Sequence, residues 1–362
     1  MSATSKQRVR NAMTWQPVDR LPVKHEARDE VNRALMACLG SPDEFSLYDR
    51  LGDDFRRVRP LYIGPELKKY PDGSWEGPWG ETWHTVRAED GKSIYNETIF
   101  LPYRDTLSLD ELAGRRFPSA DWYDFSSIPA QCQAAGERCV LFGDPAHFEI
   151  INGVARLRGV EQVLVDLAND DPVYLALADA RFRFYYDLTE CALKAAHGQI
   201  DLVHCGQDLG TQHGPLISPR TFERIFAPRL AEYFAMIHRY SARVMLHSCG
   251  SVRRFIPYLI DLGLDVLDVV QPGAAGMDVR DLHDQFAGKI CFAGSLDVQT
   301  TLPKGSPEDV AREVRLRWEL FKTGGLILGP THQIQGDTPL ENVLTMYQTV
   351  REVSQPDEEH EK

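Results

Sequence analysis

The stretch "RVMLHSCGSV", residues 243–252, runs from a short aliphatic segment through a histidine and a cysteine to a break at Gly250. Before it comes a longer segment, 218–241, which opens with serine and proline and has apolar residues three and four positions apart. That spacing and that opening predict an amphipathic helix. A helix followed by a buried strand that ends at a glycine is the repeating unit of a parallel α/β fold.

The same unit recurs along the chain. Helical patterns with a similar opening cover 171–196 and 306–323. Eight candidate strands are present: 21–25, 55–63, 138–143, 201–206, 243–247, 264–270, 289–294 and 325–329. Eight strand–helix units predict a (β/α)8 TIM barrel. We expect one barrel domain over residues 1–350, followed by an acidic tail, 351–362.

One segment interrupts this pattern. Residues 72–125 are rich in glycine, proline and aromatic residues and hold four of the six tryptophans. Stretches such as "GSWEGPWGETW" contain too many helix breakers to be helical, so we expect a β-hairpin and loop insertion. Two uses are open for it: it covers one end of the barrel, or it lines a substrate pocket with aromatic surface.

Composition excludes several classes of function. The net charge is −13, without a clustered basic face, which argues against a nucleic-acid partner. No apolar run approaches the roughly 20 residues that span a bilayer, and the N-terminus lacks the apolar centre of a secretion signal. We therefore expect a cytoplasmic protein without a membrane partner. The seven cysteines are scattered, with no CxxC pair, so a disulfide framework is not expected.

Polar residues follow most of the candidate strands. Because the carboxyl ends of barrel strands share one mouth, these side chains are expected to meet in one cavity. They are His147 and Glu149 after the third strand, Asp208, Gln212 and His213 after the fourth, His247 and Cys249 at the fifth, Gln271 after the sixth, Asp297 after the seventh, and His332 and Gln333 after the eighth.

Three of these residues suit a metal ion. His247 and Cys249 lie two positions apart in an extended segment, so their side chains share a face. Imidazole and thiolate together favour Zn²⁺, and a catalytic zinc site has three protein ligands and an open position. His332 would complete such a set. A His-x-Cys pair taken alone is more often structural, but its place at a barrel mouth favours a metal site.

The other strand-end residues have expected roles around that metal. Asp208 is a candidate exchangeable fourth ligand or proton donor, although a loop or helix-capping carboxylate is an equally good interpretation. Asp297 is a second candidate catalytic carboxylate. Candidate substrate-binding residues are His147, Glu149, Gln212, His213, Gln271 and Gln333.

The chain resembles the uroporphyrinogen decarboxylase superfamily, and within it the zinc-dependent methyltransferases that act with corrinoid proteins. The resemblance rests on "RVRNAMTWQPVDRLPV" (8–23), "IDLVHCGQDLGTQHGPLISP" (200–219), "HSCGSV", "GLDVLDVVQP" (263–272) and "GDTPLENV" (336–343). It implies zinc ligation by His247 and Cys249. His332 stands where these relatives have a second cysteine before the Thr338-Pro339 motif. The arginine-rich segment used for decarboxylation is replaced by "LPVKHEARDEV", so that activity is not expected.

The ligand set favours one reaction among those of the family. One thiolate with two imidazoles leaves zinc with a formal charge of +1, which makes it a harder Lewis acid suited to oxygen. We therefore expect removal of a methyl group from a methoxylated substrate, with an aryl methyl ether suiting the aromatic insertion. The chain has no cobalamin-binding Asp-x-His-x-x-Gly motif, so the corrinoid would be carried by a separate protein.

Three alternatives stay open at this point. One is zinc-dependent alkyl transfer to or from a thiol without a corrinoid. The others are a lyase like uroporphyrinogen decarboxylase and a non-catalytic zinc-binding barrel. The coordination separates the last of these, because four protein ligands would fill the metal and leave no position for a substrate.

Overall fold

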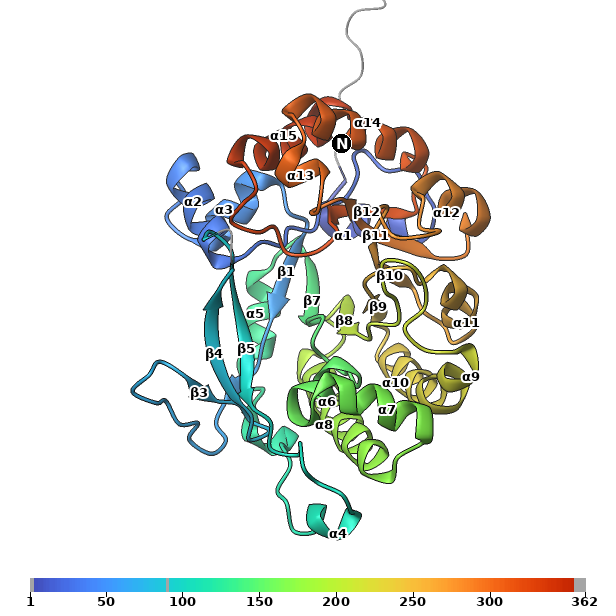
Figure 1. Ribbon diagram of the computed structural model, residues 1–362. Coiled ribbons are helices and arrows are strands. Elements are labelled where there is room, and N and C mark those ends of the chain that lie inside the picture. Colours follow the sequence, from blue (N-terminus) through green and yellow to red (C-terminus); the bar gives the residue numbers. More distant parts are fainter. Residues whose placement is uncertain (1–2, 89–90, 355–362) are drawn as a thin grey trace, which may run out of the picture.

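The computed structural model describes residues 3–88 and 91–354. A single sheet of seven parallel strands curls around a central axis, with helices on its outer side (Figure 1). This is the barrel-type α/β architecture that the sequence predicts. In sheet order the strands are β1 (Phe55–Val58), β7 (Cys139–Gly143), β8 (Leu202–Gly206), β9 (Arg243–His247), β10 (Val266–Val270), β11 (Cys291–Leu296) and β12 (Leu326–Pro330).

The eighth position of the ring is held by a single residue rather than a strand. Val23 forms a parallel bridge to Leu328 of β12, and its carbonyl accepts a hydrogen bond from Asp54 N, just before β1. The predicted strand 21–25 is therefore only this bridge. Pro22 has no N–H to donate to a ladder, which limits pairing at this edge. The segment nevertheless lies between the two edge strands and closes the barrel.

The barrel has separate inner and outer cores. Side chains at alternate strand positions, among them Leu141, Leu202 and Met245, form a buried cluster with Val9 of helix α1. A much larger buried cluster packs the helices around the outside of the strands. This alternation follows from the two-residue period of strands and gives a filled barrel rather than a pore.

The helices follow the predicted pattern, with one break. Helix α8 (Pro172–Ala196) begins where Asp171 accepts hydrogen bonds from Val173 N and Tyr174 N, and α14 (Pro307–Phe321) begins with a capping box at Ser306. The predicted helix 218–241 is instead α9, a π-helical turn at Phe222–Phe226 and α10. Pro228 has no N–H to donate within the helix, which accounts for the interruption.

The α-helices of the described chain are α1 (Ser5–Met13), α2 (Asp29–Leu39), α3 (Glu44–Leu51), α4 (Leu109–Leu112), α5 (Ile128–Ala134), α6 (Asn152–Arg158), α7 (Val160–Asn169), α8 (Pro172–Ala196), α9 (Pro219–Thr221), α10 (Ala227–Arg239), α11 (Ile256–Asp261), α12 (Val279–Phe286), α13 (Thr301–Lys304), α14 (Pro307–Phe321) and α15 (Leu340–Glu352). Short 3₁₀ turns lie at Ala120–Trp122 and Arg253–Phe255.

The insertion is a small antiparallel sheet beside the barrel (Figure 1). It consists of β3 (Trp75–Glu76), β4 (Thr82–Arg87) and β5 (Ile94–Phe100), and a separate pair joins β2 (Leu61–Tyr62) to β6 (Tyr123–Asp124). The antiparallel strands of this sheet confirm the predicted hairpin insertion.

The predicted strand 55–63 is split between β1 and β2, with Pro60 in the gap.

The end of the chain differs from the predicted boundary. Helix α15 continues to Glu352, so the first two residues of the predicted tail are helical. Residues 355–362 of that tail lie outside the described residues. No helix in the described chain is long and apolar enough to cross a membrane.

Candidate metal centre

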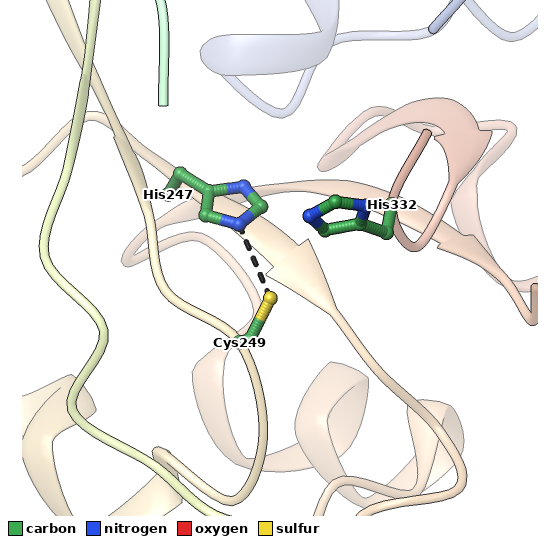
Figure 2. Close-up of side chains that lie close together, drawn as sticks. All are labelled: His247, Cys249 and His332. Atoms are coloured by element: carbon green, nitrogen blue, oxygen red, sulfur yellow. Dashed lines mark hydrogen bonds between the residues drawn. The ribbon is translucent and has the colours of Figure 1, made fainter. Parts of the chain in front are cut away.

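Three side chains converge at the carboxyl ends of β9 and β12. His247 is the last residue of β9, Cys249 follows two positions later, and His332 lies just after β12. His247 Nε2 is 3.2 Å from Cys249 Sγ, and the two imidazole rings are 5.9 Å apart between centroids. One ligand atom from each residue lies within 4.8 Å of the other two. Figure 2 shows the thiol and the two rings facing a common point.

Asp268 orients the first of these histidines. It is the register partner of His247 on the neighbouring strand β10, and only 1% of its surface is exposed. Asp268 Oδ2 lies 2.8 Å from His247 Nδ1. A carboxylate on one ring nitrogen fixes the imidazole orientation and leaves the other nitrogen for a metal, the usual arrangement behind a metal-bound histidine.

The same carboxylate is the centre of a buried charge network. Asp268 Oδ2 also lies 3.0 Å from His204 Nε2, and Asp268 Oδ1 lies 3.0 Å from Lys24 Nζ, which in turn pairs with Glu26. Burial would raise the pKa of Asp268, but Lys24 and the two histidines hold that pKa well below its usual range. Burial and the charge of Lys24 lower the pKa of His204 to about 4, so this ring is neutral at neutral pH.

A second group of potential ligands overlaps the first. His204, His247 and Asp268 also bring their ligand atoms within 4.8 Å of one another, and all three are buried. Lys24 occupies the other oxygen of Asp268, and its positive charge disfavours a cation there. His247, Cys249 and His332 are therefore the better candidate set of metal ligands, and Asp268 contacts the ring of His247 on the opposite side from Cys249.

The donor atoms of this set fit zinc. Zn²⁺ takes imidazole and thiolate ligands at about 2.0–2.3 Å in tetrahedral geometry, which places neighbouring ligand atoms about 3.3–3.8 Å apart. The His247–Cys249 separation is 3.2 Å. Among the described residues, no fourth histidine, cysteine or carboxylate joins the group. The set thus has the composition of an open zinc site.

Asp208 lies beside this set but is held by other groups. Its Oδ1 accepts a hydrogen bond of 2.8 Å from the Cys249 backbone N–H, and its Oδ2 accepts one of 2.8 Å from Asn152 Nδ2. Gln271 acts similarly, because its Oε1 accepts from Gly250 N. Both residues hold the loop that carries the cysteine.

Two cavities adjoin at this end of the barrel. The metal cavity, of about 500 Å³, is lined by His247, His332, Asp208, Gln333, Glu149 and others. The aromatic cavity, of about 450 Å³, is lined by Trp79 and Trp83 of the insertion together with Tyr123, Phe184, Tyr185 and His147. Arg59, Asp144, Ala146 and Arg156 line both cavities. The insertion therefore supplies one wall of a pocket next to the metal ligands.

The remaining strand-end residues divide between the two cavities and positions outside them. Glu149 lines the metal cavity, where burial and the nearby Asp208 raise its pKa to about 7. His147 lines the aromatic cavity, and its Nε2 is buried without a hydrogen-bond partner in the described chain. His213 and Gln212 lie on an exposed loop, where Gln212 Oε1 accepts from Gln271 Nε2. Asp297 lines neither cavity, and its oxygens accept from Gln299 N and Thr300 N, a capping role.

Sequence reasoning missed Asp268, Lys24 and the two arginines that line both cavities. Asp268 sits inside "LDVLDVV", a run that otherwise marks a buried strand. A charged residue within such a strand is the signal that could have found it, because a buried carboxylate needs partners. No comparable signal marks Arg59 and Arg156, which follow different strands.

Comparisons with known proteins find one matching family and one curated relative. Residues 180–353 match the family Uroporphyrinogen decarboxylase (URO-D). A curated methylated-thiol–coenzyme M methyltransferase from Methanosarcina mazei is 28% identical over 144 residues, which are 39% of this chain and 35% of that protein. The match thus spans about a third of the relative's length.

A solved structure shows the fold over nearly the whole chain. A methyltransferase from Methanosarcina mazei superposes with a TM-score of 0.63 at 18% identity and covers 97% of this chain and 99% of that one. At this identity the similarity concerns the fold. Residues 180–353, the segment that matches the uroporphyrinogen decarboxylase family, contain all three candidate ligands.

Proposed function

We propose that this protein is a zinc-dependent methyltransferase that demethylates an aryl methyl ether and passes the methyl group to a corrinoid on a separate protein. The observation that carries the proposal is the set His247, Cys249 and His332, which opens onto a cavity with an aromatic cavity beside it. The related protein that acts, by its name, on methylated thiols and coenzyme M supports methyl transfer as the class of reaction.

The geometry favours a catalytic metal over a structural one. Two of the three ligands line the metal cavity, and no further ligand is found among the described residues. A structural zinc is closed by four protein ligands, whereas a catalytic zinc keeps one position for water or substrate. The alternative of a non-catalytic zinc barrel is therefore the weaker one.

His247, Cys249 and His332 would hold the zinc ion, which would supply Lewis acidity toward an ether or phenolic oxygen. The residues of this chain hold the substrate in position: the insertion packs against the aryl ring, and Gln333 offers an amide at the cavity. A corrinoid in the Co(I) state, carried by the partner protein, would accept the methyl group as a CH₃⁺ equivalent. The electron pair of the C–O bond would stay on the phenolic oxygen, which would then take a proton from water.

Alkyl transfer to or from a thiol is the second candidate, and the curated relative favours it. That relative is named for methylated thiols. Activation of a thiol requires loss of its proton and binding of a soft thiolate, which suits a softer, more strongly neutralised zinc better than a positively charged one. The preference between oxygen and sulfur must therefore be measured on this chain.

The decisive experiment is a methyl-transfer assay with zinc-loaded protein and candidate corrinoid proteins reduced to Co(I). Methoxylated aromatics should convert Co(I) to methyl-Co(III), which is followed by absorbance. Cys249→Ser should abolish this change and reduce bound zinc, whereas Cys38→Ser, at an exposed cysteine, should leave both unchanged.

Two results would contradict the proposal. Activity with methylated thiols alone would move the assignment to the second candidate. Full activity of Cys249→Ser with less than about a tenth of an equivalent of zinc would remove the metal from the mechanism.

A further inference from the structure

The border between the two cavities carries two arginines whose guanidinium groups make no hydrogen bond in the described chain. Arg59 follows β1 and Arg156 lies on α6, and both line the metal cavity as well as the aromatic cavity. Within residues 3–88 and 91–354, neither guanidinium makes a hydrogen bond or ion pair. An arginine that lines a cavity with all its donors free is suited to an anionic ligand.

Other cavity arginines are already engaged, which singles out this pair. Arg181 donates to the Glu149 carbonyl and lies over Trp79, with its Cζ 4.9 Å from the ring centroid. Arg156 instead lies over Trp83, with its Cζ 5.5 Å from that centroid, and this contact leaves its N–H edge available. The contact also fixes the guanidinium on the wall of the aromatic cavity.

Most of the carboxylates that share these cavities are bonded to groups other than this pair. Glu26 pairs with Lys24, Glu44 accepts from Asn32 Nδ2, Glu81 accepts from Trp83 Nε1, Asp144 accepts from Ala146 N, Glu149 accepts from Gly153 N, and Asp208 accepts from Cys249 N. Arg156 acts on Glu149 through its charge, without a hydrogen bond between the two side chains. The neighbouring Arg57 also lines the metal cavity. Its Nη2 lies 3.6 Å from Glu26 Oε1, and its Nη1 is buried without a hydrogen-bond partner in the described chain.

We propose that Arg59 and Arg156 form an anion-binding subsite, and that the substrate is an aryl methyl ether carrying an acid group. The methoxy part of this proposal rests on the proposed function. Both arginines lie between the aromatic wall and the metal ligands. A ring in the aromatic cavity must therefore direct its acid group and its methoxy group toward the same side. This relation requires ortho or meta substitution and disfavours para.

The test is a binding measurement on zinc-loaded protein without any partner protein. The probes are 3-methoxybenzoate, 4-methoxybenzoate and the neutral 3-methoxybenzyl alcohol, titrated by calorimetry and by quenching of tryptophan fluorescence. We expect 3-methoxybenzoate to bind about tenfold or more tightly than either of the others, because a charge-assisted hydrogen bond is lost or misplaced in each case.

Substitutions separate a charge effect from a loss of shape. Arg59→Gln and Arg156→Gln should each weaken 3-methoxybenzoate about tenfold and leave the alcohol within about twofold. Arg156→Lys should recover part of the loss. Arg183→Gln is the matched control, because Arg183 is exposed on α8, pairs with Glu232 and lines neither cavity.

Several outcomes would overturn the subsite. They are equal affinity for the carboxylate and the alcohol, equal affinity for the meta and para acids, no binding of 3-methoxybenzoate, and equal weakening of all ligands by the arginine variants. Failure of the proposed function gives a different result: 3-methoxybenzoate would still bind in a way that depends on the two arginines, but no methyl transfer would be observed. Methyl transfer from neutral ethers, unaffected by either glutamine variant, would contradict the subsite alone.

Discussion

His247 Nδ1 lies 2.8 Å from Oδ2 of Asp268, a carboxylate on the adjacent strand that is itself paired with a buried lysine. Asp268 therefore fixes the orientation of the imidazole through Nδ1, and Nε2 on the other side of the ring faces Cys249. This arrangement makes the metal affinity depend on a residue that touches no metal.

Asp268→Asn is expected to weaken zinc binding about 10- to 100-fold, because the amide holds the His247 ring less firmly and makes it less basic. The measurement is the zinc dissociation constant by chelator competition on protein shown to be folded by circular dichroism. Asp265→Asn is the control, since Asp265 precedes the same strand at its other end and pairs with His238. Equal zinc affinity of Asp268→Asn and wild type would contradict the orienting role.

His332→Cys tests the link between ligand type and substrate. A second thiolate should keep zinc bound but neutralise it, so transfer from methoxylated substrates should fall about tenfold or more while activity toward thiols rises. Zinc content and both activities are measured on the same preparation. His332→Ala serves for comparison and should lose zinc. If the cysteine variant kept the wild-type preference, the ligand would not determine the substrate.

Lys24→Met is expected to destabilise the fold by about 3–5 kcal/mol, because it leaves Asp268 and Glu26 as buried carboxylates without their shared cation. Urea unfolding measures the change. Lys194→Met, which removes an exposed pair with Glu190 on α8, should change stability by about 0–1 kcal/mol. A similar small effect at Lys24 would show that the network is not coupled to folding.

The buried carboxyl group of Glu149 should make the free energy of unfolding depend on pH. Burial, with Asp208 nearby, raises the pKa of this carboxyl to about 7, above its ordinary value of 4.5. The folded state therefore binds this proton more tightly than the unfolded state. The stabilisation is complete below about pH 4.5 and is lost as the pH rises through about 7, by up to about 3 kcal/mol.

Glu149→Gln removes that titration. Because the amide meets the same backbone N–H donors as the carboxylate, the absolute stability of the variant also changes. The quantity to compare is therefore the pH dependence of the free energy of unfolding. Between pH 4.5 and 7.5 the unfolding free energy of the wild type should fall relative to that of the variant. Parallel curves would mean that Glu149 titrates normally. Asp53, whose pKa burial also raises to about 7, is common to both proteins and cancels in the difference.

Much of the fold follows from the sequence because its signals are local. Strand-length aliphatic runs that end at glycines predict the strands of the ring, and breakers in 72–125 predict the hairpin. The first strand is reduced to the Val23 bridge because Pro22 limits its pairing. Whether a partner strand compensates for a missing N–H depends on tertiary packing, which a local pattern does not record.

The site was predictable only as far as strand ends could be located. The spacing of His247 and Cys249 and the position of His332 after the last strand identify the ligand group. The buried partner Asp268 depends on the register between β9 and β10, and the pairing of Arg59 with Arg156 depends on two cavities meeting. The register of β9 against β10, and the placement of Arg59 and Arg156 at the same two cavities, are relations between distant segments of the chain. No spacing within the sequence encodes them.

The bridge at Val23 also has a mechanical consequence. In the described chain the segment around Val23 is joined to β12 itself by two backbone hydrogen bonds, from Lys24 N to Leu328 O and from Leu328 N to Pro22 O. Two more, from Arg28 N to Ile334 O and from Ile334 N to Glu26 O, join it to the loop beyond β12. His332 stands just beyond β12, while the other two ligands follow β9. An ion held by all three would link the end of β12, where the ring closes without a full strand, to the end of β9. The Leu328 amide should then exchange with deuterium more slowly in zinc-loaded protein than in apoprotein.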